Sequence, residues 1–237
     1  MKKIIMAVLG LFMYVAGYGF YMMPDGFEKR IDKGDGYQEF HFPNNTDRTM
    51  RYKFSATPGS KGRGDMSQWV EFYPKVLTIK PRETGLLKVY AKSPEGTPEG
   101  ENGFHLESVP VDIPQIGKDG QEIRASVGMK IATALEMIGY VGDLEPKLQI
   151  LNHRIYKEGG ETKMDVTIKN NTPKRGVEYG IEVKGKNRVT MRINVGRIRE
   201  GETSTVTLEL KNMKEKDPYE INIFEDLSYK NLVKMDI

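Results

Sequence analysis

The chain has 237 residues, of which 38% are hydrophobic and 29% are charged. This composition is typical of a soluble globular protein with one large domain or two ordinary ones, and it excludes a disordered chain. The formal net charge of +3 arises from 36 basic and 33 acidic residues, so the chain has no broad nucleic-acid-binding surface.

The first 19 residues have the layout of a secretory signal peptide. Lys2-Lys3 precede an apolar run over 4–16, and the small-x-small triplet Gly17-Tyr18-Gly19 follows. Extending the run to Met23 approaches the length of a membrane span, so an uncleaved anchor is the alternative. In either case we expect the rest of the chain to be exported. Because it contains no cysteine, its stability must come from hydrophobic cores alone.

Residues 20–143 predict a first β-sandwich. Turn residues recur at the spacing expected of a sandwich and separate eight segments with period-two alternation. These segments are 27–31, 37–42, 50–56, 70–73, 76–79, 86–91, 104–111 and 123–140. The run 131–138 has helical propensity, but its neighbours alternate and no N-cap precedes it, so we expect a strand there.

A polar hinge over 142–146 follows, and Pro146 stops any helix from crossing it. We therefore expect a second, smaller β-sandwich over 144–237. Its predicted strands are 147–151, 163–169, 176–183, 188–193, 204–211, 219–224 and 232–237.

Two turn motifs occur in both halves of the chain. Asn44-Asn45-Thr46 is repeated as Asn170-Asn171-Thr172, and the segment 79–84 is repeated as 198–203. Asn, Pro and Gly supply the backbone angles that end a strand, so these echoes predict two tandem sandwiches. Both Asn-x-Thr sequences also match the glycosylation pattern, but their role in the turns already accounts for them.

No pattern of side chains predicts catalysis. The three histidines, His41, His105 and His153, lie on separate predicted strands without a carboxylate at ligand spacing, so we expect no metal site. Motifs for a nucleophile, a zinc protease or phosphate binding are absent. We therefore expect no enzymatic activity, no cofactor and no small-molecule substrate.

The segment Arg63-Gly64-Asp65 matches the tripeptide that integrins recognise, and we expect it in a flexible glycine-rich loop. Three residues recur often by chance. The match is weak evidence for a recognition function.

The segment 123–131 has one apolar face. Alternation along a strand places these apolar side chains together: Ile123, Ala125, Val127, Met129 and Ile131. Such a row either packs into its own core or, at a sheet edge, offers its backbone and apolar side chains to another chain. From the residues alone, packing into the core is favoured.

The segment 69–83 resembles part of the PapD-like periplasmic chaperones that assist pilus subunit assembly. It has a strand, then Pro74, an apolar-x-apolar pair, and an x-Pro-x-Glu turn. The segments 86–92 and 104–111 are similar to the next two strands of that family, whereas the second half is similar only in its turns. The resemblance implies an all-β fold of two tandem immunoglobulin-like sandwiches in an L-shaped arrangement.

The same resemblance implies a periplasmic chaperone that donates a strand to a fimbrial or secreted subunit. The apolar row from Ile123 to Ile131 would then be the donor row, and an outer-membrane usher is a further candidate partner. If the strand that carries this row has neighbours on both edges, the hypothesis loses its mechanism.

Members of this family also hold the client's C-terminal carboxylate with an arginine on the first strand and a lysine on the donor strand. Here the usual Pro-x-Arg position reads Pro24-Asp25-Gly26, so Lys29 or Arg30 would have to substitute, with Lys130 as the donor-strand lysine. The alternative function is an envelope-anchored structural or adhesive module, which the uncleaved anchor and the Arg63-Gly64-Asp65 loop would fit.

Overall fold

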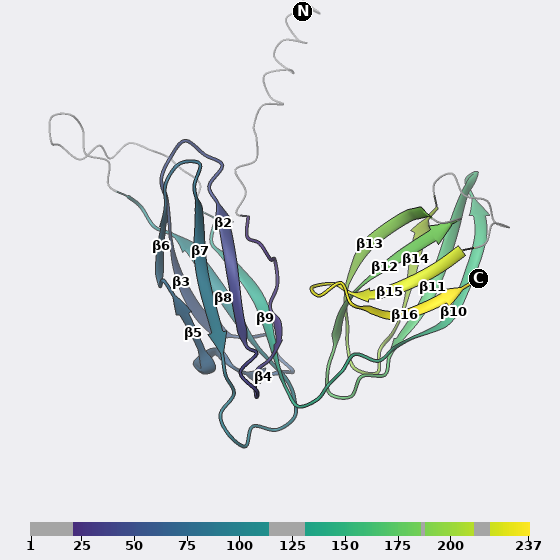
Figure 1. Ribbon diagram of the computed structural model, residues 1–237, viewed down its shortest axis with the longest axis horizontal. Helices are drawn as coiled ribbons and strands as arrows, with labels where there is room; N and C mark the ends of the chain where they lie inside the picture. The colour runs from purple at the N-terminus through teal and green to yellow at the C-terminus, as the bar shows by residue number, and fades with distance from the viewer. Residues whose placement is uncertain (1–20, 114–130, 186–187, 211–218) are drawn as a thin grey trace, which may run out of the picture.

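The computed structural model describes residues 21–113, 131–185, 188–210 and 219–237, which fold into two β-sandwiches (Figure 1). One short 3-10 turn, Ser67–Trp69, interrupts the strands. The predicted signal peptide and most of the donor row, together with Lys130, lie outside the described residues. The sheets of the described residues confirm the predicted fold class of two tandem β-sandwiches.

The first sandwich has a larger sheet with the order β1-β9-β8-β3-β6, and β4 pairs with β8. Its strands are β1 (Glu28–Arg30), β3 (Met50–Pro58), β4 (Gly64–Asp65), β6 (Val76–Ile79), β8 (Gly100–Pro110) and β9 (Thr133–Val141). The smaller sheet has the order β2-β7-β5. It contains β2 (Tyr37–Pro43), β5 (Val70–Tyr73) and β7 (Thr84–Ala91).

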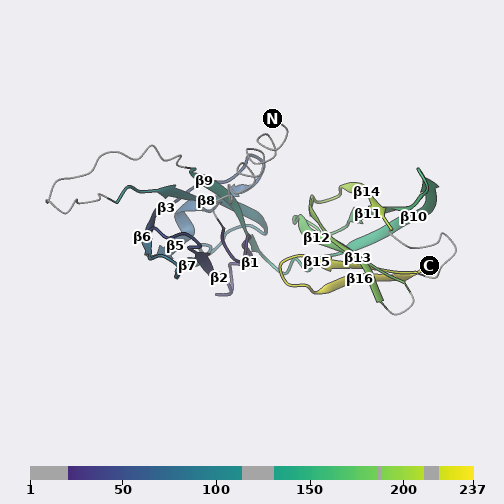
Figure 2. The same ribbon diagram turned by 90° about the horizontal axis from the view of Figure 1, so that it is seen from above.

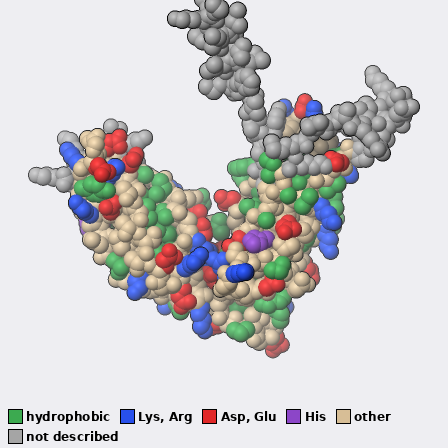
Figure 3. All heavy atoms as spheres, turned by 180° about the vertical axis from the view of Figure 1, so that it is seen from behind, with side chains coloured by type: hydrophobic (Ala, Val, Ile, Leu, Met, Phe, Trp, Pro, Cys, Tyr) green, Lys and Arg blue, Asp and Glu red, His purple; other side chains and the backbone are tan. Residues whose placement is uncertain are grey.

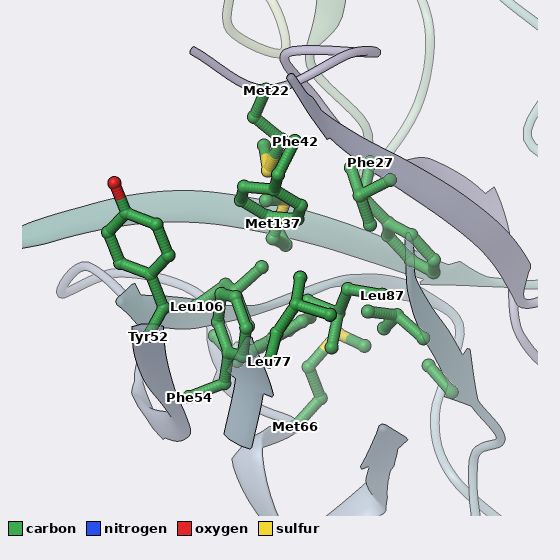
Figure 4. Packing of buried hydrophobic residues seen from close by; sticks show 14 of the residues in the cluster. Met22, Phe27, Phe42, Tyr52, Phe54, Met66, Leu77, Leu87, Leu106 and Met137 are labelled. Atoms are coloured by element: carbon green, nitrogen blue, oxygen red, sulfur yellow. The ribbon is translucent and has the colours of Figure 1, made fainter. Parts of the chain in front are cut away.

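The core between these two sheets follows from alternation. Every second side chain of a strand faces inward, so Phe40 and Phe42 of β2 are buried with Leu106 of β8 and Met137 of β9. Figure 4 shows Phe42, Leu106 and Met137 close together, and the ring centroids of Phe42 and Phe54 lie 5.3 Å apart. Because Met137 is buried in this core, a shift of β9 by one residue along β8 would expose it, so its burial fixes the register of β9.

The second sandwich is built in the same way from seven strands. One sheet contains β10 (Leu148–Glu158), β11 (Glu161–Asn170) and β14 (Thr203–Glu209). The other contains β13 (Arg188–Ile198), β12 (Val177–Gly185), β15 (Tyr219–Glu225) and β16 (Asn231–Asp236). Its core is separate, since it draws on residues 148–223 and the first core on 22–141.

The two sandwiches form separate lobes that meet near the linker and diverge from it (Figures 1 and 2). The L-shaped arrangement and the domain boundary between residues 143 and 144 stay predictions.

The repeated turn motifs have the same structure in both sandwiches. The buried side-chain amide of Asn44 donates to the backbone oxygen of Ile79, at 3.1 Å, and the amide of Asn170 donates to that of Ile198, also at 3.1 Å. The second pair of repeated turns also matches, because the equivalent residues Arg82 and Gly201 both have positive φ angles. The internal echo therefore marks one turn used twice.

Several strand bounds differ from the predictions, and two of these differences bear on the edges of the sheets. The run 131–138 is extended, but β9 begins only at Thr133, so Ile131 and Ala132 precede it. Strand β10 extends to Glu158, well beyond its predicted end at residue 151. The prediction ended too early because β10 is an edge strand, and its exposed polar side chains after residue 151 do not alternate with buried apolar ones. No helix among the described residues is long and apolar enough to cross a membrane.

Candidate functional site

The two halves of β9 have different neighbours. Strand β8 pairs with the whole length of β9, from Thr133 to Val141. On the other edge, β1 pairs only with residues 138–140 of β9. Among the described residues, no strand covers the outer edge of the five positions from Thr133 to Met137.

The path of the N-terminal segment explains why the cover is partial. Met23 pairs with His41 in the smaller sheet, and after Pro24 and Gly26 the chain crosses to the larger sheet as β1. The amide of Ile138 donates to the Phe27 carbonyl oxygen at 2.8 Å, which starts the pairing. Strand β1 is only three residues long, so it cannot cover more of β9.

The described part of the donor row does not enter the core. Ile131 is 54% exposed, although an isoleucine in the core would be almost fully buried. Within β9 the same alternation continues inward through Leu135 and Met137. Ile123, Ala125, Val127 and Met129 lie outside the described residues, so their role as donors stays a prediction.

A cleft of about 510 Å³ lies between the two sandwiches, next to the covered half of β9. The first sandwich contributes the segment from Pro24 to Arg30 and Tyr140, and the second contributes Arg175 and Glu225. Figure 3 shows basic and acidic side chains gathered where the two lobes meet. Lys29 and Arg30, the two carboxylate-anchor candidates in the described residues, both line this cleft.

Arg30 is already engaged. Its guanidinium forms two hydrogen bonds with Asp32, at 2.8 and 3.1 Å, and lies 3.5 Å from Asp143 Oδ1. The hydrogen bond from Arg30 lowers the pKa of Asp32, which keeps this carboxylate ionised. Another carboxylate would have to compete with Asp32 for Arg30.

Lys29 is different, because it forms no ion pair with any residue that the structure describes. Of the two candidates, Lys29 and Arg30, only Lys29 therefore has a charged group that no described carboxylate already pairs with. Lys130 lies outside the described residues, and its role also stays a prediction.

Along the wall of the cleft, a buried ion-pair network joins the two sandwiches. Arg175 Nη2 donates to Glu28 at 2.7 Å and to Glu225 at 2.8 Å, and its guanidinium lies 4.0 Å from the centroid of the Tyr140 ring. The side chains of Arg175 and Glu28 are 3% and 5% exposed. Burial alone would lower the pKa of Arg175, but Glu28, Tyr140 and Glu225 together outweigh it and raise the pKa above its ordinary value.

A second arginine extends the network. Arg197 lies 2.8 Å from Glu28 Oε2 and forms an ion pair with Glu101 of β8. Both carboxylates belong to the first sandwich and both arginines to the second. Because an unpaired buried charge is costly, this network stabilises one arrangement of the two sandwiches.

The sequence gives no direct sign of this network. Arg175 follows the repeated Asn-Asn-Thr turn, and the Asn170 amide holds the Arg175 carbonyl oxygen at 2.9 Å. The turn could thus have drawn attention to Arg175. Its partner Glu28 lies far away in the sequence, with no spacing that relates the two residues.

The predicted flexible loop at Arg63-Gly64-Asp65 is wrong. Gly64 and Asp65 form β4, which pairs in parallel with β8, and Arg63 forms ion pairs with Glu101 at 3.0 Å and Glu136 at 2.8 Å. Asp65 accepts a hydrogen bond from the Ser67 amide at 2.9 Å. The tripeptide is therefore part of the sheet, held by backbone pairing and by the partly buried ion pairs of Arg63.

The histidines lie apart on three strands: His41 on β2, His105 on β8 and His153 on β10. The described residues contain no group of three acidic, histidine or cysteine side chains that could hold a metal ion.

No protein-family model matches the chain, and a search of curated proteins finds no match. Solved structures similar to the chain include the CupB2 chaperone of Pseudomonas aeruginosa, with 11% identity, a TM-score of 0.46 and coverage of 91% of this chain and 98% of that one. The DraB chaperone of E. coli has 6% identity, a TM-score of 0.47, and coverage of 93% and 98%.

A complex of the SafA pilin with the SafB chaperone from Salmonella enterica is also similar, with 10% identity, a TM-score of 0.48, and coverage of 93% and 96%. Because each TM-score is below 0.5, we base the function on β9 and the cleft and not on these similarities.

Proposed function

We propose that this protein is a periplasmic chaperone that binds fimbrial or secreted subunit polypeptides by β-augmentation along β9. The observation that carries the proposal is the half-covered edge of β9, with Ile131 exposed two residues before the strand begins. A client strand would hydrogen-bond to the open backbone from Thr133 to Met137. Pockets in the client subunit would accept the apolar side chains of the donor row.

The cleft supports a second contact with the client. Its C-terminal carboxylate would enter between the sandwiches and pair with Lys29, since Arg30 is held by Asp32. Lys130 would add a second cation from the donor strand. A carboxylate that leaves water needs such charged partners, and the pair would fix the register of the client on β9.

The client would be a subunit that lacks one strand and aggregates through its exposed edges without cover. An outer-membrane usher is a candidate for receiving the subunit afterwards. The proposed mechanism is binding, and no step of it requires catalysis or a cofactor. The alternative of an adhesive surface module has no support from Arg63-Gly64-Asp65, whose arginine is held in two ion pairs.

The proposal is tested by recovering the protein from the periplasm with its bound polypeptide and sequencing that polypeptide's C-terminus. A variant with Val127→Glu and Met129→Glu places two charges in the donor row, and we expect it to recover no client. The double variant Ser126→Glu and Gly128→Glu is the matched control, because it adds the same two charges to the opposite face. Recovery of client by the donor-row variant at the level of the control would contradict the proposal.

A further inference from the structure

The segment 59–65 approaches β8 of the first sandwich closely at two glycines. Gly64 and Asp65 pair with Asn102 and Gly103 of β8. A Cβ on Gly59 would lie 2.7 Å from the Gly103 carbonyl carbon, and one on Gly64 would overlap the Asn102 side chain. Only glycine permits this close approach, which fixes the position of Arg63 between them.

Arg63 joins two strands through two carboxylates. Its Nη1 lies 2.8 Å from Glu136 of β9, and its Nε lies 3.0 Å from Glu101 Oε2 of β8. Glu136 belongs to the open half of β9 and also accepts a hydrogen bond from the Ser60 amide at 3.0 Å. Arg63 and Ser60 therefore hold a side chain of the strand segment that we propose pairs with the client.

Glu101 continues the connection into the second sandwich. While Oε2 faces Arg63, Oε1 accepts a hydrogen bond from the Gly176 amide at 2.7 Å and forms the ion pair with Arg197. The charged contacts thus run without a break from Glu136 through Arg63 and Glu101 to Arg197. They connect the open half of β9 to the second sandwich.

The two central groups of this path, Arg63 and Glu101, are largely shielded from water. The side chains of Arg63 and Glu101 are 16% and 12% exposed, so water screens their attraction less than that of a surface pair. Burial acts to raise the pKa of Glu136, but the Ser60 hydrogen bond and the Arg63 charge outweigh it and lower the pKa. Glu136 therefore stays ionised at neutral pH.

We infer that Arg63 is a positioning residue that couples the open half of β9 to the orientation of the second sandwich. This inference rests on the proposed function and adds a coupling between its two contacts. A client that pairs with β9 and also reaches the cleft needs both parts placed correctly at once. When the contacts from Glu136 through Arg63 and Glu101 to Arg197 are intact, β9 and the cleft are already placed correctly relative to each other. Client binding then loses no free energy in ordering the two sandwiches.

Two synthetic peptides separate this role from a general structural one. Both have alternating valines that suit the edge of β9. The long peptide continues to the cleft and ends in a free carboxylate, whereas the short peptide stops before the cleft and is amidated. Loss of coupling must weaken the long peptide selectively, whereas a merely structural defect in β9 weakens both peptides alike.

The binding of both peptides is measured for the parent protein and for Arg63→Gln, Glu136→Gln and Lys61→Gln. Lys61 is exposed in the same segment and forms no ion pair with a described residue, so it is the matched control. We expect Arg63→Gln and Glu136→Gln to weaken the long peptide about tenfold and the short peptide less than about twofold. Lys61→Gln should change neither affinity.

Equal weakening of the two peptides, or no weakening by Arg63→Gln, would overturn the coupling while leaving the proposed function intact. If the parent protein binds neither peptide, the proposed function fails and the coupling with it. Thermal unfolding confirms that each variant is folded, and Glu136→Gln breaks the same path from the β9 end if Arg63→Gln does not fold.

Discussion

The open half of β9 and the junction between the sandwiches are neighbours along one strand, yet they are built in opposite ways. From Thr133 to Met137 no described strand covers the outer edge, whereas from Ile138 to Tyr140 the edge is paired with β1. The paired half lies beside buried charges that have partners on both sandwiches. A junction held by buried ion pairs beside an open edge is the arrangement that the proposed addition of a client strand requires.

The largest expected effect comes from breaking the junction. Arg175→Met leaves Glu225 and part of Glu28 without a buried partner, so we expect the free energy of unfolding to fall by about 3–5 kcal/mol in urea denaturation. Lys174→Met is the matched control, because its pair with Glu99 is exposed and should contribute no more than about 0.5 kcal/mol. Similar losses for the two variants would show that the junction is not the rigid half of the contrast.

A smaller effect is expected in the cleft, where the two basic neighbours on β1 differ. We expect Lys29→Met to weaken a peptide with a free C-terminal carboxylate about tenfold in isothermal titration calorimetry, because it removes the unpaired cation. The same peptide with an amidated end should bind both proteins equally. If Arg30→Met causes the larger loss of the carboxylate-ended peptide, Arg30 rather than Lys29 is the anchor.

The smallest effect concerns Glu220, a half-buried carboxylate whose main partner, Lys234, is exposed. A hydrogen bond from Lys234 at 2.5 Å and one from Asn222 at 2.7 Å lower the pKa of Glu220 to about 2. Since the folded-state pKa is depressed, the resulting stability is complete above the ordinary glutamate pKa and is lost as the pH falls toward about 2.

We expect Lys234→Met to raise the pKa of Glu220 toward its usual value, as measured by NMR titration of the carboxyl carbon. Linkage ties the two quantities, so stability at neutral pH should fall only by as much as this rise in pKa requires, and by less than for Arg175→Met. A loss of stability at neutral pH as large as that of Arg175→Met would show that the buried ion pairs of the junction contribute no more than a more exposed pair.

Local patterns in the sequence predicted the parts of the fold that depend on local physics. Period-two alternation located the strands, and the repeated Asn-Asn-Thr turns identified two sandwiches because Asn44 and Asn170 each cap the same kind of turn. Alternation also placed Ile131 in an apolar row. It could not decide between core and surface, because that depends on where β9 begins and on what covers its edge.

The remaining features depend on residues that are distant in the sequence. Strand β4 has two residues and no alternation, so a glycine-rich segment looked like a flexible loop. Its order comes from pairing with β8 and from the ion pairs of Arg63. The engagement of Arg30 by Asp32 could have been suspected from their spacing, but the availability of Lys29 required the assembled cleft.

Hydrogen exchange at the amides of β9 tests the central claim most directly. Without client, we expect the outward-facing amides from Thr133 to Met137 to exchange fast, while the amide of Ile138, which donates to Phe27, exchanges slowly. Adding client should protect the first group and leave the second unchanged. Strong protection of the amides from Thr133 to Met137 without any client would contradict the account.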